Sequence, residues 1–348
     1  MRLKILYIGD FTGKGDEGLT QISKKFYSHF KNIYEVKYFN AFEIKKFSSI
    51  KTILKFKPNI IHYLTGPTIR SFIISWILKR LLFGKTKTIL SATRPFLNLI
   101  DRKLIRFFKP DFIFTQAFKW QILFLQYDIP LAFIPNPVNL NKFKELENSK
   151  TNLRKKYKLP LNRKLLLHVG HFRKNRKLDF FVKLQEKIQK KNYQIIIVGS
   201  SFYPENSKLI SFLKNNNCIV IQEFIENIEE IYNACDYYIF PPLHLTQNYY
   251  PKTALEIGSI DMPISILESI VCKLPVISPH IDSLEILTRN INNPPILFAN
   301  SNVESFISTL HYLEKHRSLN FSSIIEKIDS NVVFENVDKY YNILAKGK

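Results

Sequence analysis

Cysteine is scarce in this sequence. Only Cys218, Cys235 and Cys272 occur in 348 residues, widely spaced and each in an apolar context. Three separated cysteines of odd number indicate neither a disulfide framework nor a metal site. We therefore expect three reduced side chains within a protein core.

The sequence also lacks a secretory signal and a long apolar run. Its start, MRLKILYIGDF, has no small-residue cleavage site. The stretch Ile69–Gly84 has only eight residues between Arg70 and Lys79, whereas a membrane span needs roughly 20 apolar residues. We expect a cytoplasmic chain. Ile69–Gly84 is then either a helix covering a sheet or an amphipathic helix. In the second case its cations Arg70, Lys79 and Arg80 face anionic lipid headgroups, and Phe72, Trp76 and Leu82 face inward or into the bilayer surface.

Acidic residues are few, with 29 Asp and Glu against 51 Lys and Arg. The excess is uneven, because residues 1–150 hold 26 basic and 10 acidic side chains. A coding bias toward lysine explains the total positive charge as well as a functional role does. It explains the uneven distribution of that charge less easily. A basic surface favours nucleic acid, an anionic membrane or phosphorylated substrates. Nucleic acid is the weakest of these, since no recognition motif accompanies the charge.

Short apolar runs alternate with helix-length segments twice along the chain. The first set of predicted strands is Leu3–Gly9, Asn59–Leu64, Lys87–Ala92, Asp111–Gln116 and Leu131–Pro135. The second set is Leu165–Gly170, Gln194–Ser200, Cys218–Gln222, Tyr237–Pro241 and Leu274–Ser278. This alternation predicts an α/β fold of two doubly wound domains, 1–145 and 146–330, with the polar stretch 141–163 as the linker region. A ligand would bind between them, at the carboxyl ends of the strands.

Three glycines follow the first strand with the spacing G-x-G-x-x-G: Gly13, Gly15 and Gly18. The spacing is that of a dinucleotide fingerprint, but it begins four residues beyond the strand end and encloses two acidic residues that would repel a pyrophosphate. We expect a flexible loop whose amides approach a ligand, rather than an NAD or FAD site.

Two loops of the second half suit an anion. After Gly170 the chain places His171, Arg173, Lys174, Arg176 and Lys177 just before a helix. Cations beside a helix N-terminus make a diphosphate site, although a solvated basic loop is the alternative. The second loop precedes a helix that starts near Pro263, where the amides of Ile264 and Ser265 have no helical partner. Glu268 on that helix can hold a vicinal diol such as a ribose.

Several segments resemble the family 4 glycosyltransferases of GT-B architecture. They are VGHFRKNRKLDFFVKL (169–184), IIIVGSS (195–201), FIENIEEIYNACDYYIFPP (224–242), DMPISILESIVCKLPVIS (261–278) and IPNPVNLNKF (134–143). The resemblance covers essentially the whole chain and is specific mainly between residues 134 and 278. It implies two Rossmann-like domains facing across a cleft, with the last helix, about 331–348, crossing back to the first domain.

The resemblance further implies a function. A nucleotide-diphospho-sugar would bind the second domain, and its hexosyl group would pass, with retention and no obligatory metal, to a glycan or lipid-linked acceptor held by the first. The diphosphate cations would be His171, where the family has Arg, and Arg176, helped by Arg173 or Lys174. The base would lie near Phe224 and Ile225. Glu268 matches the second glutamate of the family's E-x7-E motif.

The first glutamate of that motif is missing, because Ile260 occupies its position. Asp261 stands next to it, and two roles are open: a catalytic contact with the sugar, beside the amides of Met262, Ile264 and Ser265, or an N-cap of the following helix. A GT-B-fold protein that binds nucleotide-sugar or glycan without turnover is therefore the alternative to an enzyme.

Acceptor-side candidates in the first domain are Gly13, Gly15, His62 and Arg94, since each follows or ends a predicted strand. His62 within an apolar strand is more commonly a core histidine. No protein nucleophile is evident, and none is needed if the acceptor attacks on the face that the diphosphate leaves. We expect an enzyme of cell-surface polysaccharide synthesis whose basic first domain contacts the inner face of an anionic membrane.

Overall fold

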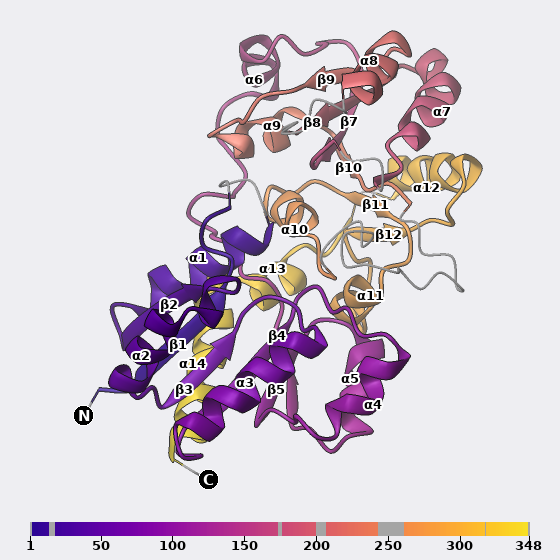
Figure 1. Cartoon of the computed structure of the whole chain (residues 1–348). Coiled ribbons are helices and arrows are strands. Elements are labelled where there is room, and N and C mark those ends of the chain that lie inside the picture. The colour runs from indigo at the N-terminus through magenta and orange to yellow at the C-terminus, as the bar shows by residue number, and fades with distance from the viewer. Residues whose placement is uncertain are drawn as a thin grey trace. The chain divides into compact units, whose positions relative to one another are not determined.

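The computed structural model describes residues 2–13, 18–172, 176–199, 207–242, 261–316 and 318–346. The chain divides into two compact units. The first comprises Met1–Pro137, Lys252–Met262 and Ser330–Lys348, and the second comprises Val138–Pro251 and Pro263–Asp329. Both termini of the chain therefore belong to the first unit (Figure 1).

The first unit is built on a six-stranded parallel sheet of order β2-β1-β3-β4-β5-β6. Its strands are β1 (Lys4–Gly9), β2 (Glu35–Asn40), β3 (Ile60–Tyr63), β4 (Lys87–Ala92), β5 (Phe112–Thr115) and β6 (Leu131–Phe133). The central strands are buried on both faces, as is usual where helices cover both sides of a parallel sheet.

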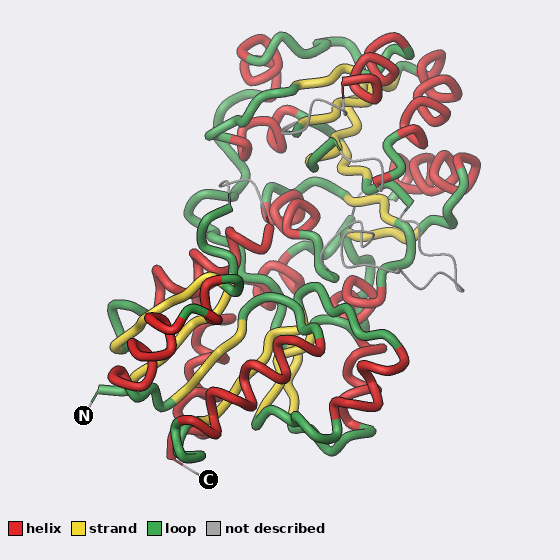
Figure 2. The backbone as a smooth tube through the Cα atoms, in the orientation of Figure 1, coloured by secondary structure: helices red, strands yellow, loops and turns green. Residues whose placement is uncertain are grey.

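The helices of the first unit connect its strands and cover both faces of the sheet. They are α1 (Gly18–Phe30), α2 (Phe47–Phe56, preceded by the 3-10 turn Glu43–Lys45), α3 (Ile69–Leu81), α4 (Leu99–Ile105), α5 (Phe118–Leu125) and α14 (Ser330–Lys346). Right-handed connections place α2 to α5 on one face of the sheet and α1 on the other. The helix α14 packs on the α1 side, where Tyr341 contacts His62 and Phe30 (Figures 1 and 2).

The second unit repeats this plan with the strand order β12-β11-β10-β7-β8-β9, again all parallel. Its strands are β7 (Lys164–Val169), β8 (Tyr193–Val198), β9 (Ile219–Ile221), β10 (Tyr237–Ile239), β11 (Val276–Ser278) and β12 (Ile296–Phe298). Its helices are α6 (Lys150–Lys156), α7 (Asp179–Ile188, followed by the 3-10 turn Gln189–Lys191), α8 (Ser207–Asn215), α9 (Ile228–Ala234), α10 (Ile264–Val271), α11 (Asp282–Thr288), α12 (Val303–Lys315) and α13 (Ser322–Ile328).

Two doubly wound sheets confirm the predicted fold class. Each strand predicted from an apolar run forms, and the structure adds β2 and β12. The three cysteines are buried and form no disulfide, as expected. Burial raises the pKa of the Cys218 and Cys272 thiols to about 12, so both stay protonated at neutral pH.

The hydrophobic stretch Ile69–Gly84 forms α3, which covers the sheet. Phe72 and Leu78 are buried in the core of the first unit. Lys79, one of the cations expected to face lipid, instead donates to both carboxylate oxygens of Asp111 at 2.7 and 2.8 Å. No helix in the described part of the chain is long and apolar enough to span a bilayer.

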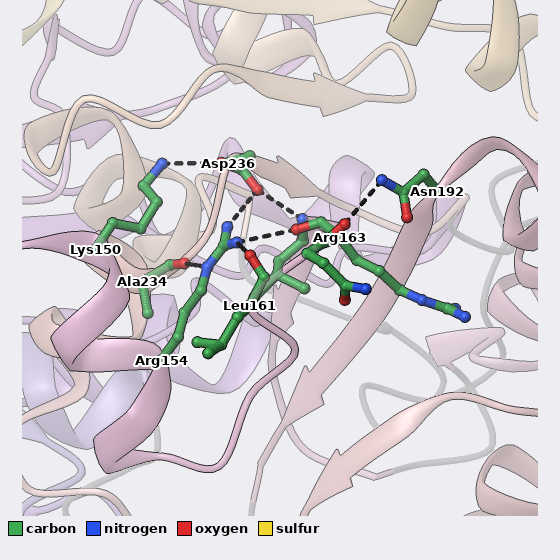
Figure 3. Close-up of polar contacts among 9 residues, drawn as sticks. Lys150, Arg154, Leu161, Arg163, Asn192, Ala234 and Asp236 are labelled. Carbon is green, nitrogen blue, oxygen red and sulfur yellow. Dashed lines mark hydrogen bonds and ion pairs between the residues drawn. The ribbon is translucent and has the colours of Figure 1, made fainter.

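The polar stretch 141–163 carries α6 and belongs to the second unit. Arg154 of α6 is buried, and its guanidinium donates to Asp236 Oδ2 at 2.6 Å and to the carbonyls of Ala234, Leu161 and Arg163 (Figure 3). The same Asp236 oxygen accepts from the amide of Leu165, where β7 begins. Arg154 therefore links this stretch to the second sheet at the amino end of β7.

Candidate functional site

The candidate site of the second unit begins where β7 and β8 end together. The amide of Gly170 donates to the carbonyl of Val198 at 2.9 Å. A Cβ on Gly199 would lie 2.0 Å from the carbonyl oxygen of Gly170, far inside van der Waals contact. Only glycine therefore allows the carboxyl ends of these two strands to approach so closely.

Arg176 lies against Gly170. A Cβ on Gly170 would lie 3.5 Å from Nη1 of Arg176 and 3.0 Å from Nε2 of His168. The guanidinium therefore lies close to the end of β7, and an added Cβ would be tight only against the ring of His168. Arg176 thus places a cation beside the end of β7, while His171 follows Gly170 and is half-buried.

His168 is a neutral histidine beneath this cation. It has no exposed surface, and its Nδ1 lies 3.2 Å from the carbonyl of Ile239. Burial, and secondly the charge of Arg176, lower the pKa of His168 to about 3. Since Nδ1 faces an acceptor, Nδ1 carries the proton in the neutral ring. Sequence reasoning missed His168, although its place near a strand end could have marked it.

Tyr238 connects the end of β7 to the start of α10. Its hydroxyl lies 2.7 Å from Oγ of Ser265 and 3.3 Å from the carbonyl of Val169. Burial raises the pKa of Tyr238, so this hydroxyl stays neutral, and the nearby charge of Arg176 acts in the opposite direction. The predicted residues Gly170, Arg176 and Ser265 are therefore brought together at one edge of the second sheet.

The helix α10 begins one residue later than predicted. Pro263 is its N-cap, so Ile264 and Ser265 are its first two residues, whose amides have no partner within the helix. Glu268 lies one turn on and is 7% exposed. Its Oε2 accepts from the hydroxyl of Tyr232 at 3.2 Å. Burial and the neighbouring Glu268 charge raise the pKa of Tyr232, which keeps that donor protonated.

Phe224 and Ile225 lie in the loop between β9 and α9. The ring of Phe224 is 65% exposed. An exposed aromatic ring can stack on a nucleobase without forming a hydrogen bond to it. Because all strands of the sheet are parallel, this loop leaves the same edge as Gly170 and Tyr238. Arg173 and Lys174 lie outside the described residues, so their predicted contribution stays a prediction.

Asp261 and Met262 belong to the first unit. The amide of Asp261 donates to the carbonyl of Thr93 at 2.9 Å, and the carbonyl of Met262 accepts from Nδ2 of Asn136 at 2.7 Å. The Met262 side chain is fully buried. Asp261 precedes the N-cap by two residues, so the structure does not support the capping role. Ile260, which replaces the expected glutamate, lies outside the described residues.

The acceptor-side candidates differ in their surroundings. Gly13 is held by its amide, which donates to Oδ1 of Asp10 at 3.2 Å, while Thr20 donates to the other oxygen of Asp10. Arg94 is half-buried, and its amide donates to the carbonyl of Gly66. Gly15 lies outside the described residues. Asp10, which accepts from Gly13 and Thr20 just after β1, was not singled out in the sequence.

His62 is a core residue. It has no exposed surface, and its ring nitrogens lie 2.6 Å from the hydroxyl of Tyr341 and 2.7 Å from Oγ of Ser91. Burial lowers the pKa of His62 to about 3. A fully enclosed ring cannot touch an acceptor, so the core reading is favoured over the acceptor-side one.

Comparison with known proteins agrees with this geometry. Residues 163–316 match the family model described as glycosyl transferases group 1. No curated protein matches the chain in sequence. A glycosyltransferase from Rickettsia africae ESF-5 is similar in structure over 100% of both chains, with a TM-score of 0.75 and 14% identity.

Two further solved structures are similar. Anabaena Alr3699/HepE, determined in complex with UDP-glucose, aligns with a TM-score of 0.69 and 12% identity over 98% of this chain and 99% of its own. The pneumococcal O-GlcNAc transferase GtfA, in complex with UDP and GlcNAc, aligns with a TM-score of 0.58 and 12% identity over 85% of this chain and 60% of its own. The chain thus has the GT-B fold, and residues 163–316 are similar to the family model of the group 1 glycosyl transferases.

Proposed function

We propose that this protein is a hexosyltransferase that moves a sugar from a nucleotide-diphospho-sugar to a glycan or lipid-linked acceptor. The observation that carries the proposal is the meeting of Arg176, Gly170 and the start of α10 at one edge of the second sheet. A fixed cation and helix-terminal amides are what a leaving diphosphate requires. The family match over residues 163–316 supports the same reading.

In the proposed reaction, the bond between the anomeric carbon and the diphosphate oxygen breaks, and its electron pair stays on the diphosphate. Arg176, assisted by His171 and by the amides of Ile264 and Ser265, offsets the developing charge. The acceptor oxygen bonds to the anomeric carbon from the face that the diphosphate leaves, and the hydroxyl proton passes to the diphosphate. Configuration is retained, and no metal is obligatory, so a chelator should leave the rate unchanged.

Glu268 is proposed to accept hydrogen bonds from the ribose hydroxyls. The bond from Tyr232 fixes the orientation of its carboxylate, so the carboxylate needs little reordering when a donor binds. Phe224 and Ile225 would lie against the nucleobase. Asp261 is proposed to act on the sugar, since the N-cap position that was its alternative is occupied by Pro263.

The acceptor is proposed to bind the first unit at the Gly13–Gly18 loop and Arg94. Both sites follow strand ends of the first sheet, the edge at which ligands of doubly wound domains bind. A role in cell-surface polysaccharide synthesis, in the cytoplasm at the inner face of the membrane, completes the proposal.

One specific observation favours a second function. His171 stands where the resemblance expects a permanent cation, and Ile260 stands where it expects a carboxylate. A protein with these changes could retain nucleotide-sugar binding through Arg176 and Glu268 yet turn over poorly. The second candidate is therefore a GT-B-fold binding protein for nucleotide-sugar or glycan.

Both functions can be tested by thermal shift and by hydrolysis of UDP-, GDP-, ADP- and CDP-sugars. Arg176→Gln and Glu268→Gln should each weaken donor binding roughly tenfold to 100-fold, because each removes a charged hydrogen-bonding partner. The exposed Arg289 and Glu326 supply matched controls, as Arg289→Gln and Glu326→Gln, which should bind normally.

Each outcome has a distinct meaning. The transferase is supported if one nucleotide class stabilises the wild type, the two site variants lose this stabilisation, and the wild type turns the donor over. Stabilisation without hydrolysis or transfer to any tested glycan favours the binding protein. If no nucleotide-sugar stabilises the wild-type chain, the donor site itself is wrongly assigned.

A further inference from the structure

The outer face of α4 and α5 in the first unit exposes large apolar side chains. Leu99 and Ile100 are each 70% exposed, Phe107 is 58%, Ile122 is 45% and Leu125 is 58% exposed. The sheet-facing sides of these helices are filled by other residues, namely Ile105, Trp120, Leu123 and Phe124. The core of the first unit therefore does not require the exposed set, which we call the α4–α5 surface.

These two helices are neighbours on the sheet. They join β4 to β5 and β5 to β6, and those strands are adjacent and parallel. Right-handed connections of adjacent strands lie next to each other on one face. Figure 1 shows α4 and α5 together beside that sheet. The exposed apolar residues thus form part of one face rather than isolated points.

The same face is basic. Lys103, Arg106, Lys109 and Lys119 are exposed on or beside α4 and α5. Lys103 and Arg106 form no ion pair with the described residues, and the Arg106 guanidinium lies 4.6 Å from the ring centre of Phe107. Three carboxylates lie between residues 99 and 128. Asp101 is buried and accepts from the amide of Asn98, the N-cap of α4, Asp111 pairs with Lys79 at 2.7 Å, and Asp128 pairs with Lys109 at 3.9 Å.

We propose that the α4–α5 surface docks on an anionic lipid membrane, with Leu99, Ile100 and Phe107 entering the headgroup region and Lys103 and Arg106 on lipid phosphates. Apolar residues beside cations are the composition of helices that lie in the membrane interface. A protein partner fits less well, because lysine is depleted from protein interfaces. Nucleic acid fits less well too, since four of the five exposed apolar side chains are aliphatic and offer no stacking surface to bases.

The position of this surface has a consequence for the acceptor. The helix α4 starts after β4, so Leu99 and Ile100 lie near the carboxyl edge of the first sheet. A docked protein would hold that edge close to the bilayer, where a lipid-linked acceptor emerges. This consequence rests on the proposed function, whereas docking itself does not.

The test is co-sedimentation of the full chain with vesicles of phosphatidylcholine, with and without phosphatidylglycerol. We expect binding only to the anionic vesicles and its loss at about 1 M salt, where the Debye length is about 3 Å. Lys103→Gln with Arg106→Gln should weaken binding roughly 25-fold, at about fivefold per cation. Leu99→Gln with Ile100→Gln should also weaken it at constant charge.

Matched controls lie on α8 of the second unit. Lys208→Gln with Lys214→Gln removes the same number of exposed cations, and Phe212→Gln removes an apolar side chain that is 44% exposed. Both controls should bind vesicles like the wild type. Melting temperatures identify any variant that fails to fold. If the variant that replaces Leu99 and Ile100 fails to fold, the variant that replaces the exposed Lys103 and Arg106 decides the test.

Three results would overturn the proposal: no binding to anionic vesicles, equal loss in the α8 controls, or retention on nucleic acid but not on vesicles. Donor binding is measured on the same variants. Lost docking with a normal nucleotide-sugar shift separates this surface from the donor site. Docking without any nucleotide-sugar shift would refute the proposed function alone.

Discussion

Gly199 and Gly170 differ in what surrounds them, and so should their alanine variants. A Cβ at position 199 meets backbone at 2.0 Å, which cannot move without separating β7 from β8. Gly199→Ala should therefore destabilise the second unit by about 3 kcal/mol or more, read from chemical unfolding.

At position 170 a Cβ meets side chains at 3.0 and 3.5 Å. Gly170→Ala should cost less stability, because its tight contact is with the side chain of His168, and should change donor binding little, because the contact with Arg176 is an ordinary van der Waals distance. Comparison of unfolding curves and donor titrations separates the two effects. Equal destabilisation by both substitutions would contradict the geometry.

Two buried histidines should make stability depend on pH. Burial lowers the pKa of His62 and of His168 to about 3, below the ordinary value of about 6.5. Between these values the unfolded chain binds protons that the folded chain does not, so stability falls as pH falls below about 6.5. Each histidine contributes a slope approaching about 1.4 kcal/mol per pH unit.

Unfolding curves measured between about pH 6 and pH 5, above most carboxyl pKa values, test this effect. His62→Gln and His168→Gln should each reduce the slope by one histidine's share. His316→Gln, at an exposed position, is the control for the substitution itself. A flat profile in the wild type would show that the rings are not held neutral.

At the scale of elements, Arg154 anchors α6 to the strands of the second unit (Figure 3). Arg154→Ala would leave Asp236 and several carbonyls without their buried donor, and should cost about 3–5 kcal/mol. Lys150 contacts the same Asp236 at 2.9 Å but is 47% exposed. Lys150→Ala should cost at most about 1 kcal/mol. Urea unfolding of both variants checks the difference, and similar costs would mean that the network contributes little.

Elements with a strong apolar pattern could be predicted from the sequence, and weakly patterned ones could not. The buried parallel strands are continuous apolar runs, so all of the predicted ones form. The strand β2 is an edge strand that pairs only with β1, and its residues Glu35, Lys37 and Tyr38 are exposed. The strand β12 is also an edge strand, which pairs only with β11, and two of its three residues are half-buried.

The site shows the same division. Gly170, Arg176 and Glu268 lie in loops and a helix whose order along the chain suggested them. His168 and Tyr238 are strand residues whose polar partners come from distant segments, so the sequence around them gives no sign of those partners. The exposed apolar face of α4 and α5 could not be predicted either, because exposure depends on which side of each helix packs against the sheet.

At the scale of the molecule, the first unit depends on the last helix of the chain. Tyr341 of α14 is fully buried and bonds to His62, and Tyr340 packs on Phe112 and Phe114. Deletion of residues 330–348 should therefore leave the first unit unfolded or aggregated. The second unit, which contains none of these residues, should keep its fold.

Limited proteolysis followed by mass spectrometry checks this outcome. Fragments of the second unit should survive in the truncated chain, while the first unit is degraded. A milder variant, Tyr341→Phe, removes only the hydroxyl and should cost about 1–3 kcal/mol. Protection of the first unit without its last helix would contradict the prediction.

Membership of both chain ends in one unit also has a consequence during synthesis. The face of the first sheet that carries His62 and Phe114 leaves the ribosome long before Tyr340 and Tyr341 exist. At about 5–20 residues per second, that face waits on the order of ten to fifty seconds for its cover. The second unit can close in the meantime, so the part of the protein made first is the part finished last.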